Sequence, residues 1–416
     1  MTRETKARIP TAAEIRRITK RGVAWIITED EFVAKLKSGK RLRLKMGFDP
    51  TAPAITLGWA VGLRKLRQLQ DLGHTVVVII GDWTARIGDP SGQSQTRSML
   101  TAEEVQANSE AILRQFYKVL DESRTEIRRQ SEWFDAFTLT DVVRLAARVT
   151  VAQILERDDF AQRFAAHKPI GLHELLYPLL QAYDSVAVEA DMEFGGTDQK
   201  FNILLGRELQ RAAGQKAGPA GEGQAVLLVP LLVGLDGTQK MSQSLSNFIA
   251  IDDPPHEMFG KLMSIPDTLT MDYLELLTGV PDGELAALRK DVERGGTKAM
   301  DAKARLAREV VSQFHGADAA EEANAAFERT FRKREVPVEA IEVPLSDGQM
   351  TILRILTEAR AVSSVNEARR LIRQGGVDID GEVVTSPAAL VSAGSVIRVG
   401  KHRFLRIVDA DKHPAA

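Results

Sequence analysis

The chain has 416 residues, which is too long for a single hydrophobic core and predicts two or three domains. Hydrophobic residues make up 44% and charged residues 27%, a composition typical of globular proteins, and the lack of cysteine excludes disulfides and thiolate metal sites. The net charge of -2 gives no overall attraction to nucleic acid, so any RNA contact must come from a local basic patch.

The N-terminal stretch from Met1 to Pro10 is polar and basic and lacks the apolar core of a secretion signal. No apolar run along the chain approaches the ~20 residues of a membrane span. We therefore expect a cytoplasmic protein without membrane contact. Residues 11–40 mix apolar and charged positions at roughly helical spacing.

The next segments alternate between strand and helix patterns. An apolar run at Leu42–Met46 predicts a strand, which ends in the loop Gly47–Thr51. A helix is expected from about Gly58 to Leu72, and the β-branched run Val76–Ile80 predicts a parallel strand that is buried on both faces. Strand, helix and strand form a βαβ unit, and ligands of such sheets bind at the carboxyl ends of the strands.

Residues from about Thr101 to Phe164 have a mostly helical pattern. A further strand is expected at Val226–Val229, continuing beyond Pro230 through Leu231–Val233. Residues 253–335 are helical and charged, and they carry no recognisable motif.

The segments Val336-Pro337-Val338 and Val343-Pro344 predict a linker. A compact module is expected after it, beginning after Ser346. Its pattern predicts helices at Leu353–Ala359 and Val365–Gln374. Short alternating strands are expected at Val377–Gly381, Ser395–Val399 and Arg403–Val408.

Two polar loops follow the first predicted strands. The loop Gly47–Thr51 precedes a helix and can aim backbone N–H groups at phosphates, although a structural turn is the commoner reading of Pro and Gly there. In the segment Gly81–Gly92, Asp82 and Asp89 can hold an ammonium group, or the carboxylates can act as local caps.

Three further segments carry polar side chains in patterns that suit a ligand. Tyr177, Gln181 and Asp184 are spaced to share one helix face, which predicts a buried polar pocket or else a face in water. The Gly-Gly pair in Gly195–Gln199 predicts a turn that a ligand can approach, or an ordinary tight turn. The loop Leu235–Ser244 offers a lysine to phosphate, as any surface loop can.

In their order and spacing these segments resemble those of class I aminoacyl-tRNA synthetases, specifically of bacterial tyrosyl-tRNA synthetases. The similarity covers nearly all of the chain and rests on Gly47–Thr51, Ile87–Gly92, Gly195–Gln199 and Leu235–Ser244. The segment Ser364–Gly381 resembles an S4 RNA-binding domain, which the family carries at the same place.

This resemblance implies an α/β fold with three domains. They are a Rossmann-like parallel-sheet catalytic domain at 1–250 with a helical insertion at about 101–190, a helical anticodon-binding-like domain at 251–340, and a small α+β S4 domain at 345–412. It also implies tyrosine, ATP and tRNA as substrates, Mg²⁺ from solution, no tightly bound cofactor, and a homodimer.

The resemblance assigns roles to individual residues. Asp89, Tyr177 and Gln181 would hold the tyrosine ammonium, and Asp184 would accept a hydrogen bond from the phenol and so reject phenylalanine. The implied tyrosine-binding set is Asp49, Thr84, Asp89, Tyr177, Gln181, Asp184 and Gln199. The implied ATP-binding set is Gly47, Gly58, Gly196, Asp198, Lys240 and Met241, and the catalytic set is Thr51, Lys240, Ser242 and Ser244.

Three arginines in the C-terminal module recur at helical spacing and would lie on an RNA-facing helix. They are Arg369, Arg370 and Arg373, and they come just before the Gly-Gly turn of that module. A solvated basic face is the alternative, and their position favours RNA.

The sequence departs from the family at several charged or imidazole positions. The His-x-Gly-His signature reads Thr56-Leu57-Gly58-Trp59, and the Lys-Met-Ser-Lys-Ser signature has Gln243 for its second lysine. Gln93 stands where a basic residue is usual, and Lys45 stands where some members have a second phenol-binding tyrosine.

The lost groups would neutralise the charge that develops on the departing pyrophosphate, and removing one such donor typically costs about 2.7–4 kcal/mol of transition-state stabilisation. Two hypotheses follow. The chain is a tyrosine–tRNA ligase with weakened catalysis, or it is a catalytically deficient paralogue that binds tyrosine or an analogue, adenine nucleotide or RNA without turnover.

Overall fold

The computed structural model describes residues 6–90, 100–215, 223–329, 341–345, 349–359, 361–362, 364–400 and 403–409. The chain divides into two compact units, one with residues 1–254 and 261–314 and the other with residues 255–260 and 315–416. Among the helices of these described residues, none has the length and apolarity needed to cross a membrane.

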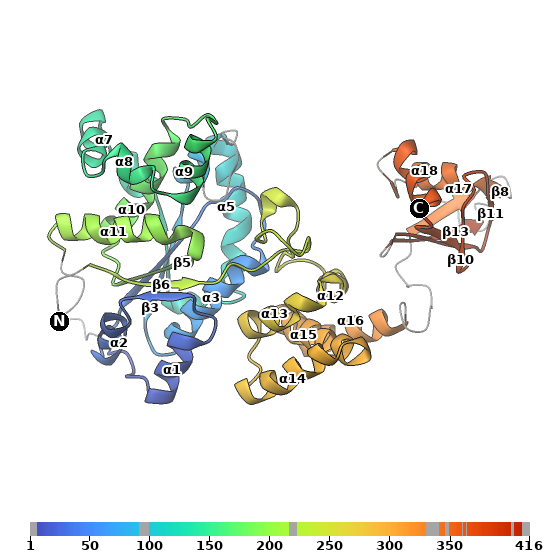
Figure 1. The fold of residues 1–416 in the computed structure, drawn as a ribbon, viewed down its shortest axis with the longest axis horizontal. Helices are drawn as coiled ribbons and strands as arrows, with labels where there is room; N and C mark the ends of the chain where they lie inside the picture. The colour runs from blue at the N-terminus through green and yellow to red at the C-terminus, as the bar shows by residue number, and fades with distance from the viewer. Residues whose placement is uncertain are drawn as a thin grey trace. The chain divides into compact units, whose positions relative to one another are not determined.

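A six-stranded sheet forms the centre of the first unit, in the order β1-β6-β5-β2-β3-β4 (Figure 1). Five strands are parallel and β1 runs antiparallel to β6. The strands are β1 (Trp25–Ile27), β2 (Arg43–Phe48), β3 (Thr75–Ile80), β4 (Thr125–Arg129), β5 (Met192–Gly196) and β6 (Ala225–Val229). All six residues of β3 are buried, as its β-branched run predicted, and the parallel α/β fold expected from the sequence is confirmed.

Helices connect these strands and cover the sheet. They are α1 (Ala12–Lys20), α2 (Glu29–Lys37), α3 (Leu57–Gln70), α4 (Thr84–Ile87), α5 (Ala102–Phe116), α6 (Ser131–Phe134), α7 (Leu139–Ala146), α8 (Val151–Ile154), α9 (Asp158–Ala165), α10 (Tyr177–Ala187) and α11 (Lys200–Ala212). The predicted helix after the first strand is therefore α3. Its buried Leu63, Leu66 and Leu69 recur at helical spacing, and such a stripe holds a helix against a sheet.

A run of helices follows the sheet, as the sequence predicted for residues 253–335, of which 330–335 lie outside the described residues. They are α12 (Pro255–Ser264), α13 (Thr270–Leu277), α14 (Asp282–Arg294), α15 (Gly296–His315) and α16 (Ala317–Phe327). Short 3-10 helices lie at η1 (Glu122–Arg124), η2 (Glu174–Leu176), η3 (Thr197–Gln199), η4 (Gln243–Leu245) and η5 (Asp267–Leu269).

Two predictions about the strands were wrong. Leu231–Val233 does not continue the strand, because Pro230 has no N–H to donate to a neighbour; Val233 forms only an isolated bridge with Lys240. Gly195 and Gly196 do not form a tight turn either. They end β5 and pair with Leu228 and Val229 of β6.

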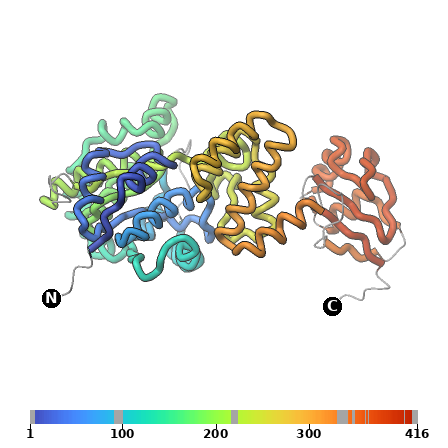
Figure 2. The backbone as a smooth tube through the Cα atoms, turned by 90° about the horizontal axis from the view of Figure 1, so that it is seen from below, coloured from blue at the N-terminus to red at the C-terminus, as the bar shows by residue number. Residues whose placement is uncertain are grey.

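The C-terminal part of the chain, red in Figure 2, contains the two helices and three strands that were predicted there. The predicted linker was wrong at Val343-Pro344, which pair with Ile407 and Val408 in the sheet of this module. Its helices are α17 (Ile352–Glu358) and α18 (Val365–Arg373). A five-stranded sheet has the order β10-β9-β12-β13-β7, and β11 pairs with β8. The strands are β7 (Ile341–Leu345), β8 (Gln349–Thr351), β9 (Val377–Ile379), β10 (Glu382–Val383), β11 (Leu390–Ser392), β12 (Val396–Val399) and β13 (Arg403–Asp409). Buried Ile352, Ile372 and Leu405 belong to its own apolar core.

Buried His74 predicts a loss of stability in acid. Its Nδ1 accepts a hydrogen bond from the backbone N–H of Leu42 at 3.2 Å, and burial lowers its pKa from 6.5 to about 4. The unfolded chain therefore takes up the proton first as the pH falls. The full stability is present above pH 6.5, and we expect about 3 kcal/mol to be lost as the pH falls from 6.5 to 4.

Urea denaturation across this pH range measures the effect of His74. The control is His74→Asn, because an amide oxygen can accept the same N–H but does not titrate. The free energy of unfolding of the variant should fall less steeply with acid. Parallel curves for the two proteins would contradict the prediction.

Candidate active site

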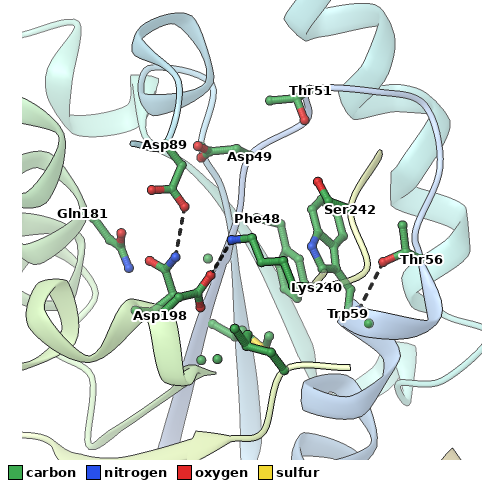
Figure 3. A pocket seen from close by; sticks show the side chains of 18 of the residues that line it. Phe48, Asp49, Thr51, Thr56, Trp59, Asp89, Gln181, Asp198, Lys240 and Ser242 are labelled. Carbon is green, nitrogen blue, oxygen red and sulfur yellow. Dashed lines mark hydrogen bonds and ion pairs between the residues drawn. The ribbon is translucent and has the colours of Figure 1, made fainter. Parts of the chain in front are cut away.

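A cavity of about 220 Å³ lies at the carboxyl ends of β2, β3, β5 and β6 (Figure 3). Ligands of parallel α/β sheets bind at this edge. The structure brings together there all the predicted tyrosine-site, ATP-site and catalytic residues that it describes. They are Gly47, Asp49, Thr51, Thr56, Gly58, Trp59, Thr84, Asp89, Tyr177, Gln181, Asp184, Gly196, Asp198, Gln199, Lys240, Met241, Ser242, Gln243 and Ser244. Gln93 and Gly92 lie outside the described residues.

Asp184 on α10 forms the deep polar end of the cavity and is almost completely buried. Its Oδ2 accepts a hydrogen bond from Gln130 Nε2 at 2.8 Å, whereas its Oδ1 has no partner within the described part of the chain. Burial raises the pKa of Asp184 to about 7, against the opposing charge of Lys45. A buried carboxylate oxygen that lacks a donor is costly, so this position suits a ligand hydroxyl.

Gln130 was not predicted from the sequence, and it determines which oxygen of Asp184 is open. Its Oε1 accepts hydrogen bonds from the backbone N–H groups of Thr84 at 2.9 Å and Trp83 at 3.2 Å. The NH₂ group of the Gln130 amide must therefore point to Asp184. Gln130 thus occupies Oδ2 and leaves Oδ1 for a ligand.

Asp49 is held at the cavity by two hydroxyl donors. Its Oδ2 accepts from the Tyr177 hydroxyl at 2.9 Å, and its Oδ1 accepts from Thr84 Oγ1 at 2.7 Å. Burial and the adjacent Asp49 carboxylate raise the pKa of Tyr177, which keeps the phenol protonated. A side chain at Gly81 would collide with Asp49 and Thr84, so only glycine fits beneath this pair.

A buried polar network positions Asp89. Gln199 Nε2 donates to Asp89 Oδ2 at 2.9 Å, and Asn202 Nδ2 donates to Gln181 Oε1 at 2.7 Å and to Gln199 Oε1 at 3.2 Å. Arg157 Nη1 in turn donates to Asn202 Oδ1 at 2.8 Å. Sequence reasoning missed Arg157 and Asn202. The only signal was the spacing of Asn202 three residues after Gln199 at the start of α11.

Asp82 was a candidate ammonium ligand or local cap and is neither, because its carboxylate binds Ser131, which lies 49 residues further along the chain. Its Oδ1 accepts from the backbone N–H of Ser131 at 2.9 Å, and its Oδ2 accepts from the Ser131 hydroxyl at 2.6 Å. Asp82 does not line the cavity. Of the two acidic residues after β3, only Asp89 faces the site.

The family has histidines at the positions of Thr56 and Trp59, and these two residues lie in different environments here. Thr56 is buried, and its Oγ1 accepts from the Trp59 N–H at 3.4 Å as the N-cap of α3. Figure 3 shows the Trp59 side chain among the residues that line the cavity. Its indole contacts Phe48 edge to face, with ring centroids 5.0 Å apart. Neither residue contributes a charge to the site.

The loop Lys240–Ser244 lines the cavity and makes several polar contacts with other parts of the protein. Lys240 Nζ lies 2.7 Å from Asp198 Oδ2. Gln243 Oε1 accepts from Thr51 Oγ1 at 3.2 Å, and Gln243 Nε2 donates to the carbonyl of Ala54. The hydroxyls of Ser242 and Ser244 are 2.9 Å apart. These polar contacts within the protein thus hold the loop in its position at the cavity.

Lys45, where some family members have a second phenol-binding tyrosine, does not line the cavity. It is fully buried, and its Nζ lies 2.8 Å from Glu193 Oε1. It also donates to Ser185 Oγ at 2.8 Å and to the Gln181 carbonyl at 3.0 Å. Lys45 therefore forms a buried ion pair beneath α10.

Helix α18 presents the three candidate RNA-binding residues to solvent. Ser364 caps the helix by accepting from the Glu367 N–H at 3.2 Å, and Ala368 and Ile372 are buried in the core. Arg369, Arg370 and Arg373 lie exposed on the same helix. The basic face is therefore available to a polyanion.

The profile of the family described as tRNA synthetases class I (W and Y) matches residues 37–332, and that of the S4 domain matches residues 350–397. A protein of Dehalococcoides mccartyi named tyrosine--tRNA ligase is 53% identical over 395 residues, which cover 95% of this chain and 98% of the relative. One of the same name from Moorella thermoacetica is 50% identical over 397 residues, covering 94% and 95%.

Solved structures with the same fold include a C-terminally truncated mitochondrial tyrosyl-tRNA synthetase of Aspergillus nidulans. Its TM-score is 0.64 at 21% identity, over 76% of this chain and 94% of that chain. The tyrosyl-tRNA synthetase of Archaeoglobus fulgidus complexed with L-tyrosine has a TM-score of 0.58 at 23% identity, over 75% and 99%. The sequence relatives and the family profile establish that this chain belongs to the class I tRNA synthetases (W and Y) and carries an S4 domain.

Proposed function

We propose that the chain is a tyrosine–tRNA ligase. The tyrosine carboxylate attacks the α-phosphorus of ATP, the bond to the β-phosphate breaks, and pyrophosphate leaves; a tRNA hydroxyl then attacks the carbonyl carbon and AMP leaves. The observation that carries the proposal is the open Oδ1 of buried Asp184, which suits a phenol donor. The names of the relatives, at 53% and 50% identity, support tyrosine as the amino acid.

The proposal includes three domains: a catalytic domain at 1–250, a helical anticodon-binding-like domain at 251–340 and an S4 domain at 345–412. The exposed arginines of α18 support RNA contact by the last of these. Mg²⁺ from solution would accompany ATP. Among the described residues, no group of three His, Asp or Glu side chains that could hold a metal ion occurs. A cytoplasmic homodimer completes the proposal.

We propose further that activation of tyrosine is slow. Formation of pyrophosphate places negative charge on the leaving group, and preorganised donors normally stabilise that charge. Thr56 instead caps α3, Trp59 offers an indole, and Gln243 holds the loop through an uncharged amide. Lys240 faces the cavity as an ion pair with Asp198.

Tyrosine-dependent pyrophosphate exchange tests both proposals. We expect slow exchange, and the triple reversion Thr56→His, Trp59→His and Gln243→Lys should raise the rate at least ~100-fold, the effect of restoring one such donor. The control is Gln239→Lys, which adds the same charge to an exposed position of the same loop, outside the cavity lining.

The outcomes separate the alternatives. Rapid exchange by the unmodified protein, unchanged in the reversion, would refute the proposed weakening. No exchange by any variant, with tyrosine still bound, would favour the binding protein without turnover. A protein that neither exchanges nor binds tyrosine is not a tyrosine–tRNA ligase.

A further inference from the structure

A buried arginine lies next to the cavity without lining it. Arg157 immediately precedes α9, and its side chain is only 3% exposed. Its Nε lies 3.1 Å from Asp159 Oδ1, whereas its Nη2 lies 3.9 Å from Oδ1 of Asp89, which lines the cavity. Asp159 is therefore the closer partner of the guanidinium, and the Asp89 carboxylate keeps room for a second cation.

The charges of these three side chains leave one negative charge unbalanced. Arg157 brings one positive charge, and Asp89 and Asp159 bring two negative ones. Charges act strongly on one another where water has little access. A ligand ammonium at Asp89 would supply the missing positive charge. The arrangement therefore suits the amino group of an amino acid.

A chain of hydrogen bonds runs from Arg157 to the cavity, and the arginine determines its direction. A guanidinium has only donors, so the Asn202 oxygen must face Arg157, whose Nη1 lies 2.8 Å from Asn202 Oδ1. Asn202 Nδ2 then donates to Oε1 of Gln181 at 2.7 Å and to Oε1 of Gln199 at 3.2 Å. The Gln199 nitrogen is left for Asp89 Oδ2 at 2.9 Å. Each amide thus has one orientation.

Loss of Arg157 would remove the reason for this orientation. An Asn202 amide that turns over would place its oxygen against the oxygens of both glutamines. If Gln199 turned over in response, its oxygen would face the Asp89 carboxylate, and two acceptors cannot bond to each other. Asp89 would then lose the donor that holds its Oδ2, at the point where it meets a ligand.

We propose that Arg157 is a positioning residue, which holds Asp89 and Gln181 in the orientation that binds the ammonium of the amino-acid substrate. The inference rests on the proposed ligase function and adds a residue that does not itself contact the substrate. Its consequence is selective. Ligands that carry the ammonium depend on Arg157, and ligands that keep only the phenol and the carboxylate do not.

Calorimetric titration of the full chain with tyrosine and with 3-(4-hydroxyphenyl)propionate, which lacks the amino group, tests the inference. Tyrosine should bind the unmodified protein more tightly than the propionate. Arg157→Met should weaken tyrosine by about 10- to 100-fold and the propionate by less than about threefold, because only the contacts to the charged ammonium are lost.

Two further variants keep the test decisive. Asn202→Leu leaves Arg157 and Asp159 paired and breaks only the chain of amides, so it should shift the ratio of the two affinities in the same direction even if Arg157→Met fails to fold. The control Arg21→Met removes another buried arginine. Arg21 donates to the backbone carbonyls of Glu275 at 3.2 Å and Thr278 at 3.0 Å, outside the cavity lining, so the ratio should stay unchanged.

Equal weakening of both ligands in Arg157→Met and Asn202→Leu, or unchanged tyrosine binding in both, would overturn the inference. Equal affinity of the unmodified protein for the two ligands would also overturn it, because no recognition of the ammonium would then exist. In these cases tyrosine binding by the unmodified protein leaves the ligase proposal standing. If the unmodified protein binds neither ligand, both proposals fail.

Discussion

Replacing Lys45 by methionine should lower the free energy of unfolding by about 3–5 kcal/mol, the usual effect of removing one partner from a buried ion pair. Lys45 and Glu193 are both essentially inaccessible to water, and their charged atoms lie 2.8 Å apart. The variant leaves the Glu193 carboxylate buried without its cation. Ser185 donates to this carboxylate at 2.9 Å, but a hydroxyl cannot balance a full charge.

Urea denaturation of three variants checks the prediction. Lys20→Met removes the lysine of an exposed pair, Lys20–Glu29, and should cost at most about 1 kcal/mol. The double variant Lys45→Met with Glu193→Leu should recover most of the loss, because no unpaired charge remains. A loss for Lys45→Met as small as that for Lys20→Met would contradict the prediction, because the buried ion pair would then contribute no more to the free energy of unfolding than the exposed pair.

The same ion pair shows what the sequence could not predict. Lys45 was recognised as a departure from the family, but its partner was hidden because residues 192–196 were not identified as a strand. In the structure Lys45 and Glu193 are neighbours in register on the parallel strands β2 and β5. The Gly-Gly pair suggested a turn, and short strands that end in glycine have little β pattern of their own.

Strands with a strong hydrophobic pattern could be predicted from the sequence, whereas strands with a weak pattern were missed. Val76–Ile80 is apolar throughout because β3 is covered on both faces, so it could be recognised. Strand β4 reads Thr-Glu-Ile-Arg-Arg, is half-buried throughout and ends the sheet order, so it was missed within the stretch Thr101–Phe164 that was expected to be mostly helical. Local composition thus reveals buried strands better than edge strands.

The cavity-lining residues were found through the resemblance, whereas the residues that orient them were not. Gln130 lines the cavity and orients Asp184, whereas Arg157 and Asn202 touch the site through other side chains, and each of the three lies in a segment without a recognisable motif. Their roles depend on contacts between segments that are far apart in the chain. Such contacts leave no periodic signal in one sequence.

Asp184→Asn should abolish most of the preference for tyrosine over phenylalanine. A hydrogen bond to a charged group contributes about 1.5–3 kcal/mol, so the ratio of the two dissociation constants should fall by about 10- to 100-fold. The amide keeps the shape of the carboxylate and a single acceptor, which Gln130 already occupies at 2.8 Å. At the position that Asp184 Oδ1 occupies in the unmodified protein, the variant then offers the phenol a weaker hydrogen-bond partner than a carboxylate oxygen.

Binding of both amino acids at pH 8 measures this ratio, because the pKa of Asp184 is about 7 and the carboxylate is then mostly ionised. Tyrosine should bind the unmodified protein more weakly at pH 6, as Asp184 takes up a proton, and the variant should lose this pH dependence. Asp141→Asn makes the same chemical change at the exposed capping box of α7, outside the cavity, and should leave the ratio unchanged. Equal preference for tyrosine in the unmodified protein and in Asp184→Asn would mean that the buried carboxylate does not recognise the phenol, and the proposed substrate would then lose its structural support.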